Sequence, residues 1–272
     1  MTSHSMPHAP VHRRPLDRRV LGYHEFSQSD SRDVYQLAPE RFAEQLAAVR
    51  TAAMQANHEL EITFDDAHRS QVELAAPLLE QAGMTGIFFV PAGWVGVRPQ
   101  TASWSDIHAL VRSGHSIGSH GQTHSLLTHC PPAALEAELV RSRKTLEDQL
   151  GCVVQSISVP GGRWNAAVAS ACLAAGYSQL YTSQPGPAPA QDLAEPQGLL
   201  TIVGRLIVRR RMALNTLASY AAGNWLATAH LRTEYQAKQA LKRLVGDVGY
   251  QALWRRLLRS PVQSAEEPTV LL

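Results

Sequence analysis

Residues 59–90, ELEITFDDAHRSQVELAAPLLEQAGMTGIFFV, decide the fold class of this chain of 272 residues. ELEITF at 59–64 and GIFFV at 86–90 are short runs typical of buried strands. The residues between them, 71–82, have the composition of a helix that ends at Gly83. A strand, a helix and a second strand in this order predict two parallel strands joined by a crossover helix.

The same alternation of strand and helix continues on both sides of this unit, and a glycine follows each expected helix after residue 70. Residues 184–197 are rich in Pro, Gly and Ala, which predicts a loop, and GLLTIVGRLIV at 198–208 supplies a last strand. About seven strands in sequence favour an α/β barrel over an open sheet, with its active site at the carboxyl ends of the strands. The other strands are expected at 20–26, 115–120, 156–160 and 179–182, and the other helices at 39–53, 104–112, 132–150 and 166–175.

The two ends of the chain differ in composition from this body. Residues 1–19 are rich in His, Pro and Arg, which predicts a disordered tail before a barrel at 20–211. The tail histidines recur every fourth residue, but the intervening prolines argue against a metal-binding helix. These histidines are His4, His8 and His12.

Residues 212–272 are expected to form a helical appendage with a basic surface. Two apolar stripes with helical spacing occur in it, and from Arg205 to Leu272 the formal charge is +7, against −5 for the rest of the chain. Such helices suit either contact with an anionic membrane face or packing against the barrel. The stripes are Leu241, Leu244, Val245 and Val248, then Tyr250, Leu253, Trp254 and Leu257.

Composition also bears on the compartment. The N-terminal residues contain no apolar core of the kind that a secretory signal needs, and no run of about 18 apolar residues occurs. The three cysteines lie far apart, which argues against a disulfide framework. We therefore expect a cytoplasmic protein, with any contact to the inner membrane face being peripheral.

Two adjacent carboxylates, Asp65 and Asp66, follow the strand at 59–64. An isolated buried carboxylate costs several kcal/mol, and two neighbours also repel each other. A pair of this kind is kept where a cation or a reaction requires it, although a lone Asp-Asp pair at a strand end is more often a turn or a helix cap.

A second motif, GSHGQTH at 118–124, follows a later strand. His120 and His124 converge if the chain turns helically after the strand, as Gly121 allows. Because the ends of parallel strands meet at one edge, the histidines and one carboxylate predict a facial metal triad with open positions for water. Two imidazoles and a carboxylate suit zinc, and also cobalt, nickel or iron.

A third motif, SVPGGRWN at 158–165, lies at another strand end. Its glycines let backbone N–H groups approach a ligand closely and stabilise an oxyanion. Taken alone, the Pro-Gly-Gly sequence is also an ordinary turn.

The motifs TFDD, SHxxxH and the Pro-Gly-rich strand end, in this order, resemble those of the polysaccharide deacetylase family (carbohydrate esterase family 4, NodB-like domain). The resemblance covers about residues 20–208 and implies a distorted (β/α) barrel that removes acetyl groups from sugars with one divalent metal ion. It implies that Asp65 is the general base. The implied metal ligands are Asp66, His120 and His124, and the implied substrate or oxyanion segment is Pro160, Gly161, Gly162, Arg163 and Trp164.

The chain departs from the family pattern at three places. Ala67 replaces the glycine that usually follows the carboxylates, a change that needs only a negative φ. The arginine that orients the base is replaced by Ser158, so Arg163 or Arg205 would have to substitute. The late histidine that acts as general acid is missing from RLIVRRRM at 205–212, which leaves His24 or His68 as candidate acids.

These observations predict a metal-dependent N-deacetylase of an acetamido sugar, free in an oligosaccharide or linked to a lipid or nucleotide, in exopolysaccharide or surface-glycan biosynthesis. One alternative is a related hydrolase of a non-sugar amide or an O-acetyl ester, because an alkoxide leaving group needs less protonation than an amine. Another alternative is a non-catalytic sugar-binding relative. Nucleic-acid binding is not expected, because the basic residues lie on helices without a recognised binding module.

Overall fold

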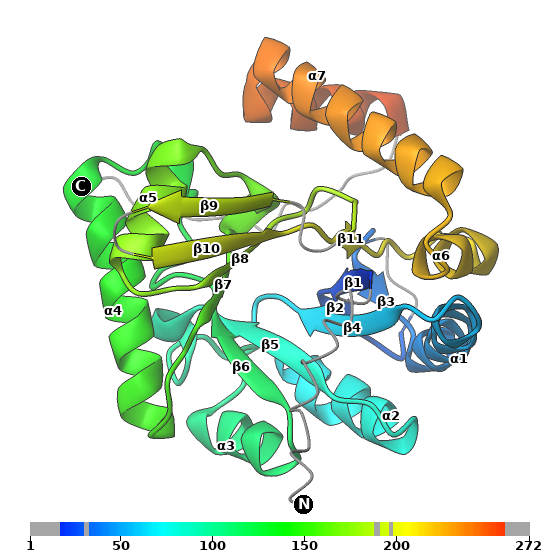
Figure 1. The fold of residues 1–272 in the computed structure, drawn as a ribbon, viewed down its shortest axis with the longest axis horizontal. Coiled ribbons are helices and arrows are strands. Elements are labelled where there is room, and N and C mark those ends of the chain that lie inside the picture. The colour runs from blue at the N-terminus through cyan, green and yellow to red at the C-terminus, as the bar shows by residue number, and fades with distance from the viewer. Residues whose placement is uncertain (1–16, 30–32, 188–190, 196–197, 259–272) are drawn as a thin grey trace, which may run out of the picture.

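A sheet of nine strands forms the centre of the computed structural model, which describes residues 17–29, 33–187, 191–195 and 198–258 (Figure 1). The strand order is β11-β1-β4-β5-β6-β7-β8-β10-β9, and all neighbours are parallel except β9 and β10. The parallel α/β architecture expected from the sequence is confirmed. The strands are β1 (Arg18–Tyr23), β4 (Glu59–Phe64), β5 (Gly86–Val90), β6 (Ser116–Ser119), β7 (Ser156–Ser158), β8 (Gln179–Tyr181), β9 (Gln191–Glu195), β10 (Gly198–Val203) and β11 (Leu206–Ile207).

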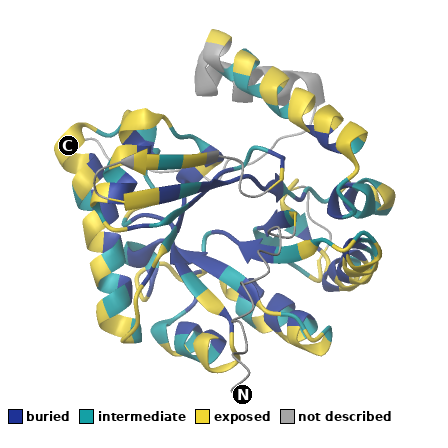
Figure 2. Ribbon diagram, viewed as in Figure 1, coloured by how far each residue is buried: buried dark blue, intermediate teal, exposed yellow. Residues whose placement is uncertain are grey.

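Helices connect the parallel strands and cover the outside of the sheet, so that the strands are mostly buried and the outer helix faces are exposed (Figure 2). The helix expected at 71–82 is interrupted, because Gln71–Ala75 form a π-helical turn before α2. The strands β2 (Glu25–Phe26) and β3 (Gln36–Leu37) form a separate small ribbon. The helices are α1 (Pro39–Gln55), α2 (Ala76–Gln81), α3 (Trp104–Arg112), α4 (Pro132–Leu150), α5 (Ala166–Ala174), α6 (Leu214–Ala221) and α7 (Trp225–Leu258).

A small apolar cluster on the inner side of the sheet shows how strongly the sheet curves. Its buried members come from four strands that are spread over the sheet, β1, β5, β8 and β10. Side chains of such distant strands meet only if the sheet curls around them. The cluster contains Val20, Phe89, Tyr181 and Val203.

The single last strand expected from the sequence is in fact two strands, β10 and β11, which lie toward opposite ends of the strand order. β10 pairs with β8, whereas β11 pairs with β1, and only Gly204 and Arg205 lie between them. No pairing joins β10 to β11 among the described strands, so the barrel is bridged here by the chain and not by a ladder of hydrogen bonds. The loop expected at 184–197 is also wrong in part, because Gln191–Glu195 pair with β10 as β9.

The two ends of the chain differ in part from expectation. β1 begins at Arg18, inside the segment expected to be disordered, while the tail histidines lie outside the described residues. Helices follow β11 as expected, and α6 packs with α1, burying Leu217 and Tyr220 in the core cluster that contains β1 and β4 residues. Leu244 is exposed, and the remaining stripe residues from Val245 onward lie outside the part of the chain whose side chains are described. None of the helices in the described segments combines the length and apolarity needed to cross a bilayer.

Candidate active site

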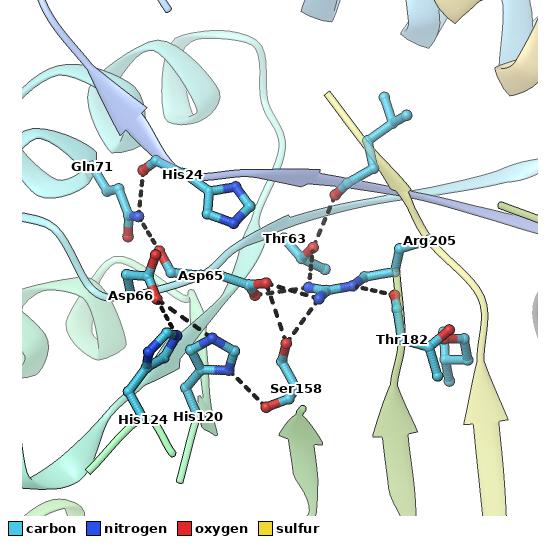
Figure 3. A network of polar contacts seen from close by, with 12 residues as sticks. His24, Thr63, Asp65, Asp66, Gln71, His120, His124, Ser158, Thr182 and Arg205 are labelled. Carbon is cyan, nitrogen blue, oxygen red and sulfur yellow. Dashed lines mark hydrogen bonds and ion pairs between the residues drawn. The ribbon is translucent and has the colours of Figure 1, made fainter. Parts of the chain in front are cut away.

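The carboxylate pair lies directly after β4, at the carboxyl edge of the sheet. Asp65 still follows the sheet, because its N–H donates to the Tyr23 carbonyl 3.0 Å away. Asp66 and Ala67 then adopt left-handed conformations, with φ of 76° and 48°, so the expectation of a negative φ at Ala67 is wrong. A left-handed non-glycine residue costs about 1–2 kcal/mol. The turn uses two of them to direct the neighbouring carboxylates toward different partners (Figure 3).

His120 and His124 meet the carboxylate of Asp66 from the segment that follows β6 (Figure 3). Their Nε2 atoms lie 3.4 Å and 3.2 Å from Asp66 Oδ1. One potential ligand atom from each of the three residues lies within 4.8 Å of the others. The segment between the histidines is not helical, contrary to expectation, because Gly121 and His124 have φ of 78° and 66°. The histidines therefore converge through an irregular loop.

The surroundings of His120 prepare it as a ligand. Its ring is buried, and its Nδ1 lies 2.6 Å from the backbone oxygen of Ser158. A carbonyl oxygen only accepts, so Nδ1 carries a proton and Nε2 is the ring nitrogen that faces Asp66 and would bind a metal ion. Burial by itself lowers the pKa of His120, but Asp65 and Asp66 outweigh it and raise that pKa. Asp66 Oδ1 is buried without a hydrogen bond among the described residues. A divalent cation would bind this oxygen together with the Nε2 atoms of His120 and His124.

Asp65 points away from this cluster and forms a bidentate ion pair with Arg205 (Figure 3). Nη1 and Nη2 of Arg205 each lie 2.8 Å from a different carboxylate oxygen, and the Ser158 hydroxyl donates to Oδ2 at 3.2 Å. Burial alone would raise the pKa of Asp65, but the Arg205 guanidinium and His120 outweigh it and hold that pKa at about 2. Asp65 is therefore an oriented and ionised carboxylate beside the three candidate ligands.

Arg205 reaches Asp65 because it lies between β10 and β11, where the chain passes from the strand beside β8 to the strand beside β1. Its side chain is fully buried and donates to the Thr182 carbonyl, the Thr63 hydroxyl and the Ser158 hydroxyl at 2.8–3.1 Å. Of the two arginines considered from the sequence, Arg205 contacts Asp65, while Arg163 lines a hollow that adjoins the cavity. Ser158 occupies the position at which the resemblance leads us to expect an arginine. Its hydroxyl contacts Arg205, which comes from the connection between β10 and β11.

The two candidate acids differ in their surroundings. His24 follows β1 and lines the same cavity as Asp65 and Asp66, and its Nδ1 is buried without a hydrogen-bond partner among the described residues. His68 is held beside this region by Ser70, whose hydroxyl lies 2.7 Å from Nδ1, and by Glu25, 3.7 Å from Nε2. His68 is not among the described residues that line the cavity.

The segment Pro160–Gly162 forms a short 3-10 turn at the end of β7, and its two glycines line the cavity. Both glycines have φ near 66°, which a side chain would make costly. The N–H of Gly162 already donates to the Val159 carbonyl at 2.9 Å. Arg163 and Trp164 face the adjoining hollow instead of the carboxylates.

Glu138 on α4 is a functional candidate that the sequence analysis did not identify. It is buried, and its Oε2 accepts the N–H groups of Gln122 and Thr123, both at 2.9 Å, from the loop that joins the two histidines. Its Oε1 accepts the Thr123 hydroxyl at 2.6 Å. The sequence gives no signal of this role, because a single acidic residue in a long helix is common. The loop that Glu138 contacts has no regular sequence pattern either.

Replacing Glu138 by Ala should weaken metal binding about 10–100-fold, because groups that orient ligands contribute that much affinity. It should also destabilise the fold, since two loop N–H groups lose a charged acceptor. The dissociation constant for zinc, measured by competition with a chelator, checks this. Glu136→Ala is the matched control, because Glu136 is exposed on the same helix. Equal zinc affinity in both variants would contradict the role of Glu138.

Comparison with known proteins relates part of this chain to a family. Residues 53–180 match the family model described as polysaccharide deacetylase. This segment belongs to the polysaccharide deacetylase family. The "Putative polysaccharide deacetylase YxkH" of Bacillus subtilis (strain 168) is 28% identical over 127 residues, which are 47% of this chain and 45% of that protein. The chain therefore spans about half the length of this curated relative.

Several solved structures share the fold at low sequence identity. The deacetylase PplD of Streptococcus pyogenes, in complex with acetate, is similar with a TM-score of 0.66 and 19% identity, covering 76% of this chain and 99% of PplD. IcaB from Ammonifex degensii is similar with a TM-score of 0.62 and 23% identity, covering 76% of this chain and 97% of IcaB. These likenesses confirm the expected fold, and the roles of the residues rest on the geometry described above.

Proposed function

We propose that this chain is a metal-dependent hydrolase that removes the N-acetyl group from an acetamido sugar. The observation that carries the proposal is the convergence of Asp66, His120 and His124 beside Asp65, a separate carboxylate that Arg205 holds ionised. One carboxylate is then available as a ligand and the other as a base. Family membership supports the deacetylase activity, while the N-acetyl specificity and the metal requirement are part of the proposal.

Each residue has a task that follows from its position. Asp66, His120 and His124 would hold one divalent ion, zinc by preference and cobalt, nickel or iron by the same donor set. When bound, the ion supplies Lewis acidity, which acidifies water and polarises the acetyl carbonyl. Asp65 takes the proton of the attacking water, and Arg205 keeps its carboxylate in place. Oδ1 of Asp65 accepts a single hydrogen bond among the described residues and so keeps a lone pair for that proton.

Two further groups complete the proposed reaction. The N–H of Gly161 is the candidate donor to the developing oxyanion, because that of Gly162 is already used. The leaving amine needs a proton, and His24 is the candidate acid that lines the cavity, with a buried Nδ1 that has no hydrogen-bond partner among the described residues. We further propose that the enzyme acts in the cytoplasm, on a lipid- or nucleotide-linked sugar or an oligosaccharide of surface-glycan or exopolysaccharide assembly. Any contact of α7 with the inner membrane face is part of the same proposal.

Acetate release tests the proposed function directly. Protein freed of metal with a chelator should bind about one zinc ion per chain and then release acetate from acetamido sugars. Asp66→Ala and His120→Ala should retain little metal and little activity. Metal binding without release from any acetamido sugar, but with release from O-acetylated sugars, would replace amide hydrolysis by ester hydrolysis. Absence of metal binding in the zinc-treated wild type would contradict the proposal.

Replacing His24 by Ala should lower the rate of amine release about 100-fold or more without loss of metal, because general acids contribute about 10²–10⁴-fold. His68→Ala should retain most of the activity, since Ser70 and Glu25 already engage that ring. Rates for both variants with an acetamido sugar and with an O-acetyl ester check this. A larger loss in His68→Ala than in His24→Ala would reverse the assignment.

A further inference from the structure

The candidate active site opens into a cavity of about 340 Å³ whose far wall is the helix α7. The residues of α7 that line it follow helical spacing from Leu231 through Tyr235 and Lys238 to Lys242. Leu231 is buried, as expected for a helix that packs on a core, but the stripe then becomes polar and basic. A helix that only covered a core would continue this stripe with apolar residues. The later turns are therefore suited to a polar occupant of the cavity.

The charges on this wall favour an anion. Glu234 lies 3.1 Å from Arg209, and Lys238 and Lys242 lie one helical turn apart on the same wall. Lys238 is half-buried and has no hydrogen bond or ion pair with another described residue. Burial, followed by the charges of Arg209 and Lys242, lowers the pKa of Lys238, while the carboxylate of Glu234 acts in the opposite direction.

A second hollow of about 600 Å³ continues the cavity along α7. It shares Gly162, Tyr235, Gln239 and Lys242 with the first and adds Arg163. Together the two hollows extend from the carboxylates, past the lysines, to Trp164 and Arg163. The space exceeds what a single sugar ring needs, so the occupant carries a further group beyond the acetylated sugar.

We propose that Lys238 and Lys242 bind a phosphate or diphosphate group attached to the acetamido sugar, so that the substrate is a phosphorylated sugar and not a neutral glycan. This inference rests on the proposed function, because it assigns the sugar to the metal side of the same cavity. Two adjacent ammonium groups suit a group with two negative charges better than the single charge of a uronate carboxylate. The phosphate belongs either to a nucleotide or to a lipid carrier, which present the same oxygens to the lysines.

Equilibrium binding to the zinc-loaded protein tests the proposal without requiring turnover. The probes are the neutral methyl glycoside of N-acetylglucosamine, its 1-phosphate, a disaccharide with glucuronate, a nucleoside diphosphate sugar and a short-chain prenyl diphosphate sugar. The phosphorylated probes should bind at least 10-fold more tightly than the neutral glycoside, and this preference should weaken as salt is added. The tighter of the two carrier-linked sugars identifies the source of the phosphate.

Variants of the two lysines decide which groups bind the phosphate. Lys238→Gln combined with Lys242→Gln should abolish the preference for phosphorylated probes and leave the affinity for the neutral glycoside unchanged. Lys144→Gln, on α4, is the control for the loss of a lysine elsewhere on the surface, because Lys144 is 72% exposed and pairs with Asp148. It should behave as the wild type.

Three results would overturn the inference: equal binding of neutral and phosphorylated probes, equal binding of the glucuronate disaccharide and the 1-phosphate, or an unchanged preference in the double variant. The proposed function fails separately. If the lysine-dependent preference is found but no acetate is released from any probe, the phosphate site stands and the deacetylase activity does not.

Discussion

Replacing Asp65 by Asn should lower the rate of acetate release about 10²–10⁴-fold, the contribution of a general base, while the protein still binds one divalent ion. The amide keeps the shape of the side chain but cannot take a proton from water. Metal content should persist, because the carboxylate of Asp65 points to Arg205 and not to the histidines. Metal analysis and acetate release on the same sample provide the check.

Asp66→Asn is the matched comparison, since it makes the same chemical change in the neighbouring residue. It should lose metal as well as activity, because Asp66 Oδ1 lies within 3.4 Å of both imidazole nitrogens. Two outcomes would contradict the division of tasks. One is loss of metal in both variants to the same degree, and the other is full activity in Asp65→Asn.

The parts of the site that the sequence predicts are those that follow directly from strand ends. Asp65 and Asp66 follow β4, and His120 follows β6, two strands further along the sheet, so parallel order alone brings them to one edge. The order of strands and helices from β4 to β8 could also be predicted, because a helix with a clear end separates each apolar run from the next.

The parts that could not be predicted depend on contacts between distant segments. GLLTIVGRLIV has the pattern of one strand, and only the curvature of the sheet breaks it at Gly204 and Arg205 and gives its halves different partners. The positive φ of Ala67 has no sequence signal, because alanine normally avoids it and the surrounding fold imposes it. The strand β9 was hidden by the Pro- and Gly-rich composition around it.

Replacing Arg205 by Met should destabilise the protein by about 3–5 kcal/mol, the usual cost of leaving one member of a buried ion pair without its partner. Arg205 is fully buried and Asp65 is 3% exposed, so the remaining carboxylate cannot be rehydrated without opening the fold. The Thr63 and Ser158 hydroxyls and the Thr182 carbonyl lose a hydrogen-bond partner as well. Urea unfolding of the metal-free protein measures the free energy without a contribution from bound metal.

The double variant Asp65→Asn with Arg205→Met separates an ion pair from a general packing effect. If the loss arises from an unpaired buried charge, removing both charges should recover part of it, and the double variant should be more stable than Arg205→Met alone. Arg41→Met is the control, because Arg41 pairs with Glu44 at 2.7 Å in a partly exposed position and its loss should cost no more than about 1 kcal/mol. Additive losses in the double variant would mean that Arg205 contributes to stability through packing alone. In that case the charge of Arg205 would serve to orient the carboxylate of Asp65. A lower rate of acetate release by Arg205→Met would show this role.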